Sequence, residues 1–96
     1  MFDVISIGAA TIDIFIKSKD LISTPDIVGL KPSSKNEISQ SLICSGGGAT
    51  NSAVSFSRLG LKSTCISLIG QSYLNQFIYD DLKKNHVPEQ FICSKK

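Results

Sequence analysis

The stretch SGGGATNSAVSFSRLG, residues Ser45–Gly60, decides the fold of this chain. Three consecutive glycines precede a segment with helical spacing, and Gly60 follows it where a left-handed glycine commonly ends a helix. The spacing predicts a helix from Thr50 or Asn51 to Leu59, with a buried side made of Ala53, Val54, Phe56 and Leu59. Many proteins hold phosphate at a glycine-rich turn of this kind.

The glycines Gly46, Gly47 and Gly48 admit three interpretations. A phosphate site is the weakest, because the GxxxxGK[ST] pattern is absent and the GxGxxG pattern lacks its third glycine. A tight strand-to-helix turn without a ligand is the structural alternative. In the third interpretation, the missing Cβ atoms let a ligand approach the backbone. Asn51, near the helix start, would then offer a donor and an acceptor to a hydroxyl group, which fits the spacing better than phosphate does.

Two predicted strands precede this stretch. Phe2–Gly8 is a short apolar run that ends in glycine, the pattern of a buried strand. Thr11–Lys17 alternates strictly, which places Asp13 on the face opposite its isoleucines. A lone carboxylate on an exposed strand face is most often only solvated. However, Asp13 lies just beyond the carboxyl end of the first strand, where open α/β sheets bind ligands, so it is a candidate for binding vicinal hydroxyls.

The rest of the chain alternates strands with a helix. Residues 18–39 are polar, and we expect loops with at most one short strand there. The apolar runs predict strands over Ile38–Cys44, Ser63–Gly70 and Phe91–Cys93. The best helix spans Tyr73–Asn85, with a predicted buried side of Leu74, Phe77, Ile78 and Leu82. This order predicts an α/β fold with a parallel sheet.

Composition narrows the class of protein. A chain of 96 residues with 42% hydrophobic and 19% charged residues is expected to form one small folded domain. Its net charge of +2 is too small to favour a nucleic-acid partner, and no apolar run is long enough to span a bilayer. The three cysteines lack metal-ligand spacing and there is no export leader, so we expect a reducing, cytoplasmic location. The one histidine, His86, is expected at a helix end on the surface.

Four segments together resemble a known family. ISIGAATIDIFI, SGGGATNSAVSFSRLG, CISLIG and FIYDDLKKNHV are similar to the N-terminal part of ribokinase/PfkB-type carbohydrate kinases, over nearly the whole chain. The resemblance implies a Rossmann-like core with a small β lid, here in one incomplete domain of residues 1–96. The lid would come from about 12–17 and 18–44, and the core from 2–8 and 45–96.

The resemblance also implies an activity. Such kinases transfer the γ-phosphoryl group of ATP, with Mg²⁺, to a hydroxymethyl oxygen of a sugar or nucleoside. By position, Asp13 and Asn51 would bind hydroxyls, and Gly46 and Gly47 would lie against the ring. Thr11 and Gly48 stand where ribokinase-like members carry asparagine and lysine, which disfavours ribose itself. The family's catalytic aspartate, anion hole and ATP pocket lie in its C-terminal half. We therefore expect no catalytic, cofactor-binding or metal-binding residue here, and an N-terminal fragment that is inactive alone.

Two other functions stay open at this stage. The chain could be a stand-alone sugar-binding module, or a module that forms a homodimer through its lid without catalysis. A nucleotide-binding regulatory fragment is a weaker possibility. No nucleic-acid or membrane partner is expected.

Overall fold

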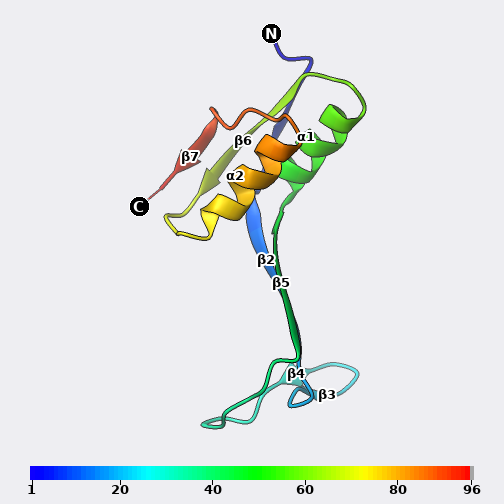
Figure 1. Ribbon diagram of the computed structural model, residues 1–96, viewed down its shortest axis with the longest axis vertical. Coiled ribbons are helices and arrows are strands. Elements are labelled where there is room, and N and C mark those ends of the chain that lie inside the picture. The colour runs from blue at the N-terminus through cyan, green and yellow to red at the C-terminus, as the bar shows by residue number, and fades with distance from the viewer. Residues whose placement is uncertain (96) are drawn as a thin grey trace.

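The chain folds into an α/β body from which a long two-stranded ribbon projects (Figure 1). The structure is a computed structural model that describes residues 1–95. In chain order the elements are β1 Val4–Ile7, β2 Thr11–Lys17, β3 Ile22–Ser23, β4 Val28–Gly29, β5 Gln40–Gly46, α1 Gly48–Arg58, β6 Ser63–Ile69, α2 Asn75–Lys84 and β7 Ile92–Ser94. The predicted α/β fold with a parallel sheet is confirmed.

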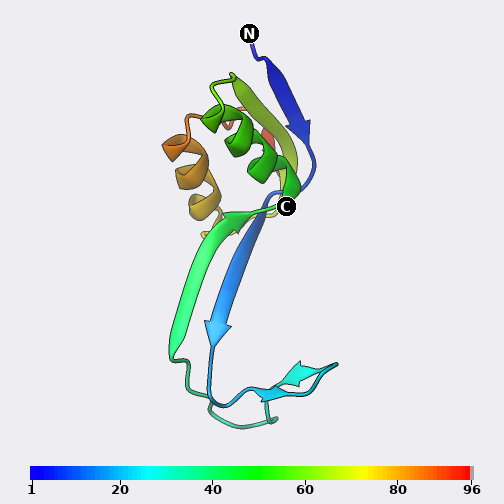
Figure 2. The same cartoon turned by 90° about the vertical axis from the view of Figure 1, so that its right-hand side faces the viewer.

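The body contains a parallel sheet in the order β1-β6-β7. Val4 pairs with Ser63 at one end of the first ladder, and Ile69 pairs with Ser94 at the end of the second. Both α1 and α2 lie on the same side of this sheet (Figure 2). Two right-handed crossovers that add strands in one direction place their helices on the same face, which accounts for the arrangement.

A small apolar core fills the space between the helices and the sheet. Ile78 and Leu82 of α2 are fully buried, one turn apart on the same side of the helix. The other buried apolar residues are Ala49, Ala53, Cys65, Ile69 and Val87. The alanines allow α1 to approach β1 and β6 closely, so the body depends on short side chains in one helix and long ones in the other.

Polar residues within the body are mostly satisfied by backbone groups. The Ser63 hydroxyl donates to the Ala53 carbonyl at 2.6 Å, and the Thr64 hydroxyl donates to the Pro88 carbonyl at 2.8 Å. Asn85, which is buried, joins the two helix ends: its side-chain oxygen accepts a hydrogen bond from Arg58 Nε at 2.9 Å. These bonds cross between elements, and therefore fix where α1 and α2 end relative to the sheet.

The projecting ribbon consists of β2 and β5, which pair in antiparallel fashion from Thr11↔Gly46 to Lys17↔Gln40. It gives the molecule a long axis of 52 Å and a radius of gyration of 16.8 Å, against about 12–13 Å for a compact chain of this length. Alternation and register divide the ribbon into two faces. The Asp13 face carries Thr11, Asp13, Phe15, Lys17, Gln40, Leu42, Cys44 and Gly46, and the isoleucine face carries Ile12, Ile14, Ile16, Ser41, Ile43 and Ser45.

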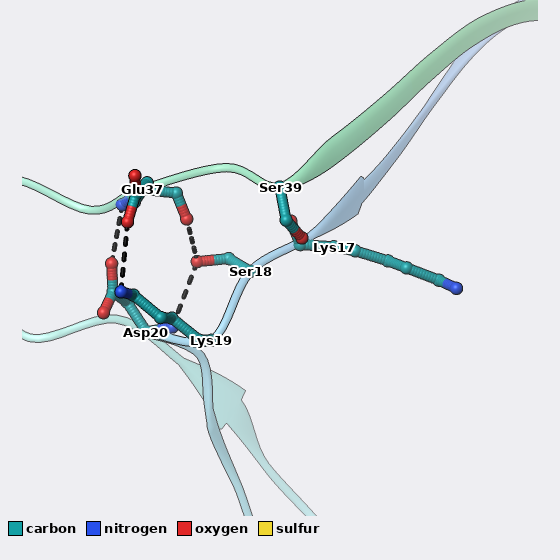
Figure 3. A network of polar contacts seen from close by, with 6 residues as sticks. All are labelled: Lys17, Ser18, Lys19, Asp20, Glu37 and Ser39. Carbon is teal, nitrogen blue, oxygen red and sulfur yellow. Dashed lines mark hydrogen bonds and ion pairs between the residues drawn. The ribbon is translucent and has the colours of Figure 1, made fainter.

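A polar clamp closes the loop at the far end of the ribbon (Figure 3). The Ser18 hydroxyl donates to the Glu37 carbonyl, and the Glu37 backbone N–H donates to Asp20 Oδ2 at 2.6 Å. An exposed ion pair joins Lys19 Nζ to Glu37 Oε2 at 3.1 Å. Beyond the clamp lies the small β3–β4 hairpin, so residues 18–39 contain two short strands rather than one at most.

No helix or strand of the described residues 1–95 covers the sheet face that points away from the helices. Four apolar side chains of β1 and β6 are exposed there, namely Ile5, Ile7, Ile66 and Leu68. The prediction of a buried first strand was therefore wrong, because only one face of β1 is covered. Within residues 1–95, neither helix has the length and apolar character needed to cross a membrane.

Several details of the predicted elements were wrong. Strand β1 and helix α2 are shorter at both ends than predicted, and β7 lies one residue further along the chain. Strand β5 runs on to Gly46 because β2 pairs with it up to that residue. Helix α1 starts at Gly48, two or three residues earlier than expected, because an N–H of its first turn finds a partner in the β1–β2 connection. Three apolar residues predicted to be buried are exposed, because the narrow sheet covers only one stripe of each helix: Leu59, Leu74 and Phe77.

Candidate functional site

The structure brings together three of the predicted site residues where the ribbon joins the body. Thr11 and Asp13 of β2 lie on the same face as Gly46, the last residue of β5. The Thr11 hydroxyl donates to Asp13 Oδ1 at 3.1 Å. A Cβ at Gly46 would overlap Asp13 Oδ2 and would lie 2.8 Å from Asp13 Cγ and 3.0 Å from Thr11 Oγ1. The carboxylate is therefore held between the Thr11 hydroxyl and the bare Cα of Gly46.

Gly47 has a structural reason to be glycine. Its backbone has φ 99° and ψ 150°, a region that residues other than glycine almost never occupy. A Cβ there would overlap the Ala9 carbonyl and lie 2.9 Å from Ala10 Cα. The same connection receives the helix, since the Ala49 N–H donates to the Ala9 carbonyl at 3.0 Å. Gly47 thus locks the start of α1 against the link between β1 and β2. Whether it also contacts a ligand stays a prediction.

The remaining two predicted site residues, Gly48 and Asn51, are exposed to solvent. A Cβ added at Gly48 would meet no atom within 4 Å, and the φ of Gly48 is not in the left-handed region. Asn51 is exposed, and its backbone N–H donates to the Gly47 carbonyl at 2.9 Å. No hydrogen bond within residues 1–95 joins the Asn51 amide to Asp13, so that amide is free to meet a ligand from the helix side.

Thr50 is a site-supporting residue that the sequence interpretation missed. It is buried at the start of α1, where its hydroxyl donates to the carbonyl of Gly46 and, at 3.1 Å, to that of Gly47. These bonds hold the turn that sets Gly46 against Asp13. A threonine two residues after a glycine run is a local-bond signal in sequence, but its two partners depend on the final turn geometry.

Leu42 was also missed as a neighbour of the site. It pairs with Phe15 across the ribbon, on the Asp13 face, one pair beyond Asp13↔Cys44 on that face. The alternation of Thr11–Lys17 already assigns Phe15 to the face of Asp13. Leu42 could not be assigned to it from sequence, because that requires the register between β2 and β5.

The cluster is suited to binding hydroxyl groups. A carboxylate with free lone pairs accepts two hydroxyl donors side by side, and Asp13 spends one acceptor position on Thr11. Exposed backbone at Gly48 and the Asn51 amide lie on the helix side of the same junction. Among residues 1–95 no three His, Cys, Asp or Glu side chains come together as metal ligands, so no metal ion is assigned to them.

The sequence matches the family described as pfkB family carbohydrate kinase over residues 1–96. The chain belongs to the pfkB family of carbohydrate kinases. The family resemblance seen in the sequence is thereby confirmed. Solved structures of similar fold match nearly the whole chain.

Three of these structures illustrate the likeness of the pfkB chain to known proteins. Ribokinase from Arabidopsis thaliana, complexed with ribose and ATP, matches with a TM-score of 0.78 at 17% identity, over 94% of this chain and 27% of that one. Nucleoside kinase from Methanocaldococcus jannaschii matches with a TM-score of 0.69 at 21% identity, over 96% of this chain and 28% of that one. Fructokinase from Xylella fastidiosa matches with a TM-score of 0.66 at 22% identity, over 95% of this chain and 24% of that one.

The pfkB chain is thus much shorter than the proteins it resembles. It spans 24% to 28% of the length of these three kinases. Identities near 20% establish a shared fold and do not transfer a substrate. Another structure of the Xylella fastidiosa fructokinase holds ATP.

Proposed function

We propose that this chain forms the acceptor-substrate side of an ATP-dependent sugar or nucleoside kinase. The observation that carries the proposal is the Thr11–Asp13–Gly46 cluster, which lies just beyond the carboxyl end of β1 and beside the start of α1. Open α/β sheets bind their ligands at that end of the strands. Asp13 would accept hydrogen bonds from two sugar hydroxyls, and Asn51 would bind a third from the helix side.

The proposed contribution of these residues is positioning. Phosphoryl transfer depends on holding the acceptor oxygen in line and on stabilising the transferred group. Asp13 and Asn51 serve the first requirement only, by orienting the sugar. ATP and Mg²⁺ would supply the phosphoryl group and its charge stabilisation. We assign nucleotide binding and the catalytic base to the remainder of a kinase of family length, of which this chain spans about a quarter.

In this proposal the ribbon acts as a lid. Residues 12–17 and 18–44 would cover the sugar, while 2–8 and 45–96 belong to the core. The clamp at Ser18, Asp20 and Glu37 would keep the tip of the lid in one shape while the ribbon moves as a unit.

The test compares two substrates in a kinase of family length that carries this segment. Asp13→Asn and Asn51→Ala are each expected to raise the KM for the sugar about tenfold or more, since each removes a hydrogen bond to substrate. The KM for ATP should stay unchanged. Asp26→Asn, in the exposed tip loop, serves as the matched control with no effect. Equal changes in both KM values would contradict the assignment. The 96-residue chain alone should show no ATP-dependent phosphorylation.

A second function, self-association through the lid, is favoured by one observation. The isoleucine face of the ribbon exposes Ile14 and Ile16 to solvent, whereas Ile12, nearer the body, packs against the core. We propose that a second copy covers this face in a homodimer. Sedimentation should show a concentration-dependent dimer that Ile14→Lys converts to monomer, and a monomer at all concentrations would exclude it.

The proposed location is the cytoplasm. Cys44, Cys65 and Cys93 are all free thiols, as expected for a protein in a reducing compartment.

A further inference from the structure

The Asp13 face of the ribbon continues outward from the hydroxyl-binding cluster as an apolar platform. Phe15 and Leu42 form the next cross-strand pair on this face, and they are 56% and 60% exposed. They line an open hollow of about 620 Å³ together with Lys17 and Gln40 of the same face, and the hollow reaches round the ribbon to Ile16 and Ser41 of the isoleucine face. A polar end and an apolar end therefore share one strand face.

The spacing between the two ends matches a ligand with two different halves. Residues two apart on a strand are separated by roughly 7 Å. Asp13 and Phe15 are two apart, so a ring of hydroxyls at Asp13 leaves room for a flat group of similar size over Phe15. A free monosaccharide has no such second half. We infer that the acceptor is a nucleoside, with its ribose hydroxyls on Asp13 and its base against Phe15 and Leu42; this rests on the proposed function.

The alternative occupant of this face is a second copy of the chain. A dimer contact across the Asp13 face would take the Asp13 carboxylate out of water with only Thr11 as a hydrogen-bond partner. Burying a charge with so little compensation is costly. The isoleucine face carries no charged group and is the better surface for self-association. A nucleoside, by contrast, supplies hydroxyl donors to the carboxylate and an aromatic surface to the platform.

The experiment uses the 96-residue chain and two probes, adenosine and methyl β-D-ribofuranoside. Dissociation constants come from saturation-transfer NMR titrations, with circular dichroism to show that each variant is folded. Adenosine should bind roughly tenfold to a hundredfold more tightly than the riboside, as one stacked base typically contributes. Phe15→Ala should remove most of that difference without changing riboside binding, and Phe15→Tyr should restore it. Ile14→Ala, on the opposite face of the same strand, is the matched control and should change neither.

Asp13→Asn distinguishes failure of this inference from failure of the proposed function. If Asp13→Asn weakens both probes while Phe15→Ala and Leu42→Ala leave adenosine binding unchanged, the hydroxyl site stands and the nucleoside inference is overturned. If Asp13→Asn changes neither probe, or the folded chain binds neither, both are overturned. If Phe15→Ala and Leu42→Ala dissociate a dimer in sedimentation without changing adenosine affinity, the platform is a self-association surface and the inference is overturned.

Discussion

The three adjacent glycines Gly46, Gly47 and Gly48 should respond to alanine in three different ways. Each has a different environment: a carboxylate, a backbone link and open solvent. The same chemical change, one added methyl group, therefore separates a ligand-binding role from a structural role.

Gly46→Ala should weaken ligand binding with little effect on stability. Its Cβ would overlap the end of the Asp13 side chain, which can rotate away at a cost of about 0.5–1.5 kcal/mol. Replacing glycine in a strand recovers roughly 0.5–1 kcal/mol, so the free energy of unfolding should change by less than about 1 kcal/mol. Displacing the carboxylate removes charged hydrogen bonds worth about 1.5–3 kcal/mol, which corresponds to a loss of affinity of at least tenfold.

Gly47→Ala should instead destabilise the fold. Its φ of 99° and ψ of 150° cost a residue with a side chain about 1–3 kcal/mol. The new Cβ also meets the Ala9 and Ala10 backbone, which cannot rotate away without moving the start of α1. We expect a total loss of roughly 3 kcal/mol or more, and a fall in Tm of more than about 10 °C for a domain of this size.

Gly48→Ala should stabilise the protein slightly. The position is helical and open, and alanine there gains about 0.5–1 kcal/mol, or a few degrees in Tm. Thermal unfolding followed by circular dichroism measures the stability of each variant, and titration with methyl β-D-ribofuranoside measures its affinity for ligand. A Gly47→Ala protein as stable as the unchanged chain would refute the turn geometry. A Gly46→Ala protein that binds the riboside normally would refute the placement of Asp13 in the site.

Three further changes test the body of the fold. Leu82→Ala should lower the free energy of unfolding by about 2–4 kcal/mol in urea, because the side chain is fully buried. Leu59→Ala, at an exposed position, is the control. Similar losses in both variants would contradict the placement of Leu82 in the core. Asn85→Ala should cost about 1–3 kcal/mol because it removes the hydrogen bonds that the buried side chain makes to Arg58 Nε and to the Asp81 carbonyl. A neutral result in urea would exclude a role in joining the helices. Among the thiols, Cys93 should react first with a thiol reagent and Cys65 only on unfolding, since Cys65 is buried. Burial raises the pKa of the Cys65 thiol, so the unfolded state loses its proton first and stability should fall as pH rises above about 8.5; Cys65→Ala should lessen that fall.

Local patterns in the sequence predicted those elements that depend on local forces. The alternation of Thr11–Lys17 placed β2 at its observed bounds, and Gly60 adopts the positive φ expected of a residue that follows a helix. The α/β class followed from the alternation of element types. For the site, the sequence predicted that Asp13 follows the carboxyl end of the first strand, which is where the structure has it.

The remaining features depend on contacts between distant segments. The start of α1 at Gly48 requires the carbonyl of Ala9, which belongs to another connection. The exposure of Leu74 and Phe77 reflects how little surface a three-stranded sheet offers to a helix. The role of Leu42 follows from strand register alone. None of these contacts has a counterpart in local composition or periodicity.

The geometry of the candidate site is set by the connections around it more than by the half-covered sheet. Gly46 faces Asp13 because β5 ends there and Gly47 turns the chain into α1. That turn is fixed by the Ala9 carbonyl and by the Thr50 hydroxyl, both of which lie on the helix side of the sheet or in its connections. The open sheet face, with Ile5, Ile7, Ile66 and Leu68, takes no part in it. Parallel sheets are normally covered on both faces, so the missing cover lowers the stability of the body. It leaves in place the contacts that hold Asp13, and the site can therefore keep its shape wherever the body itself stays folded.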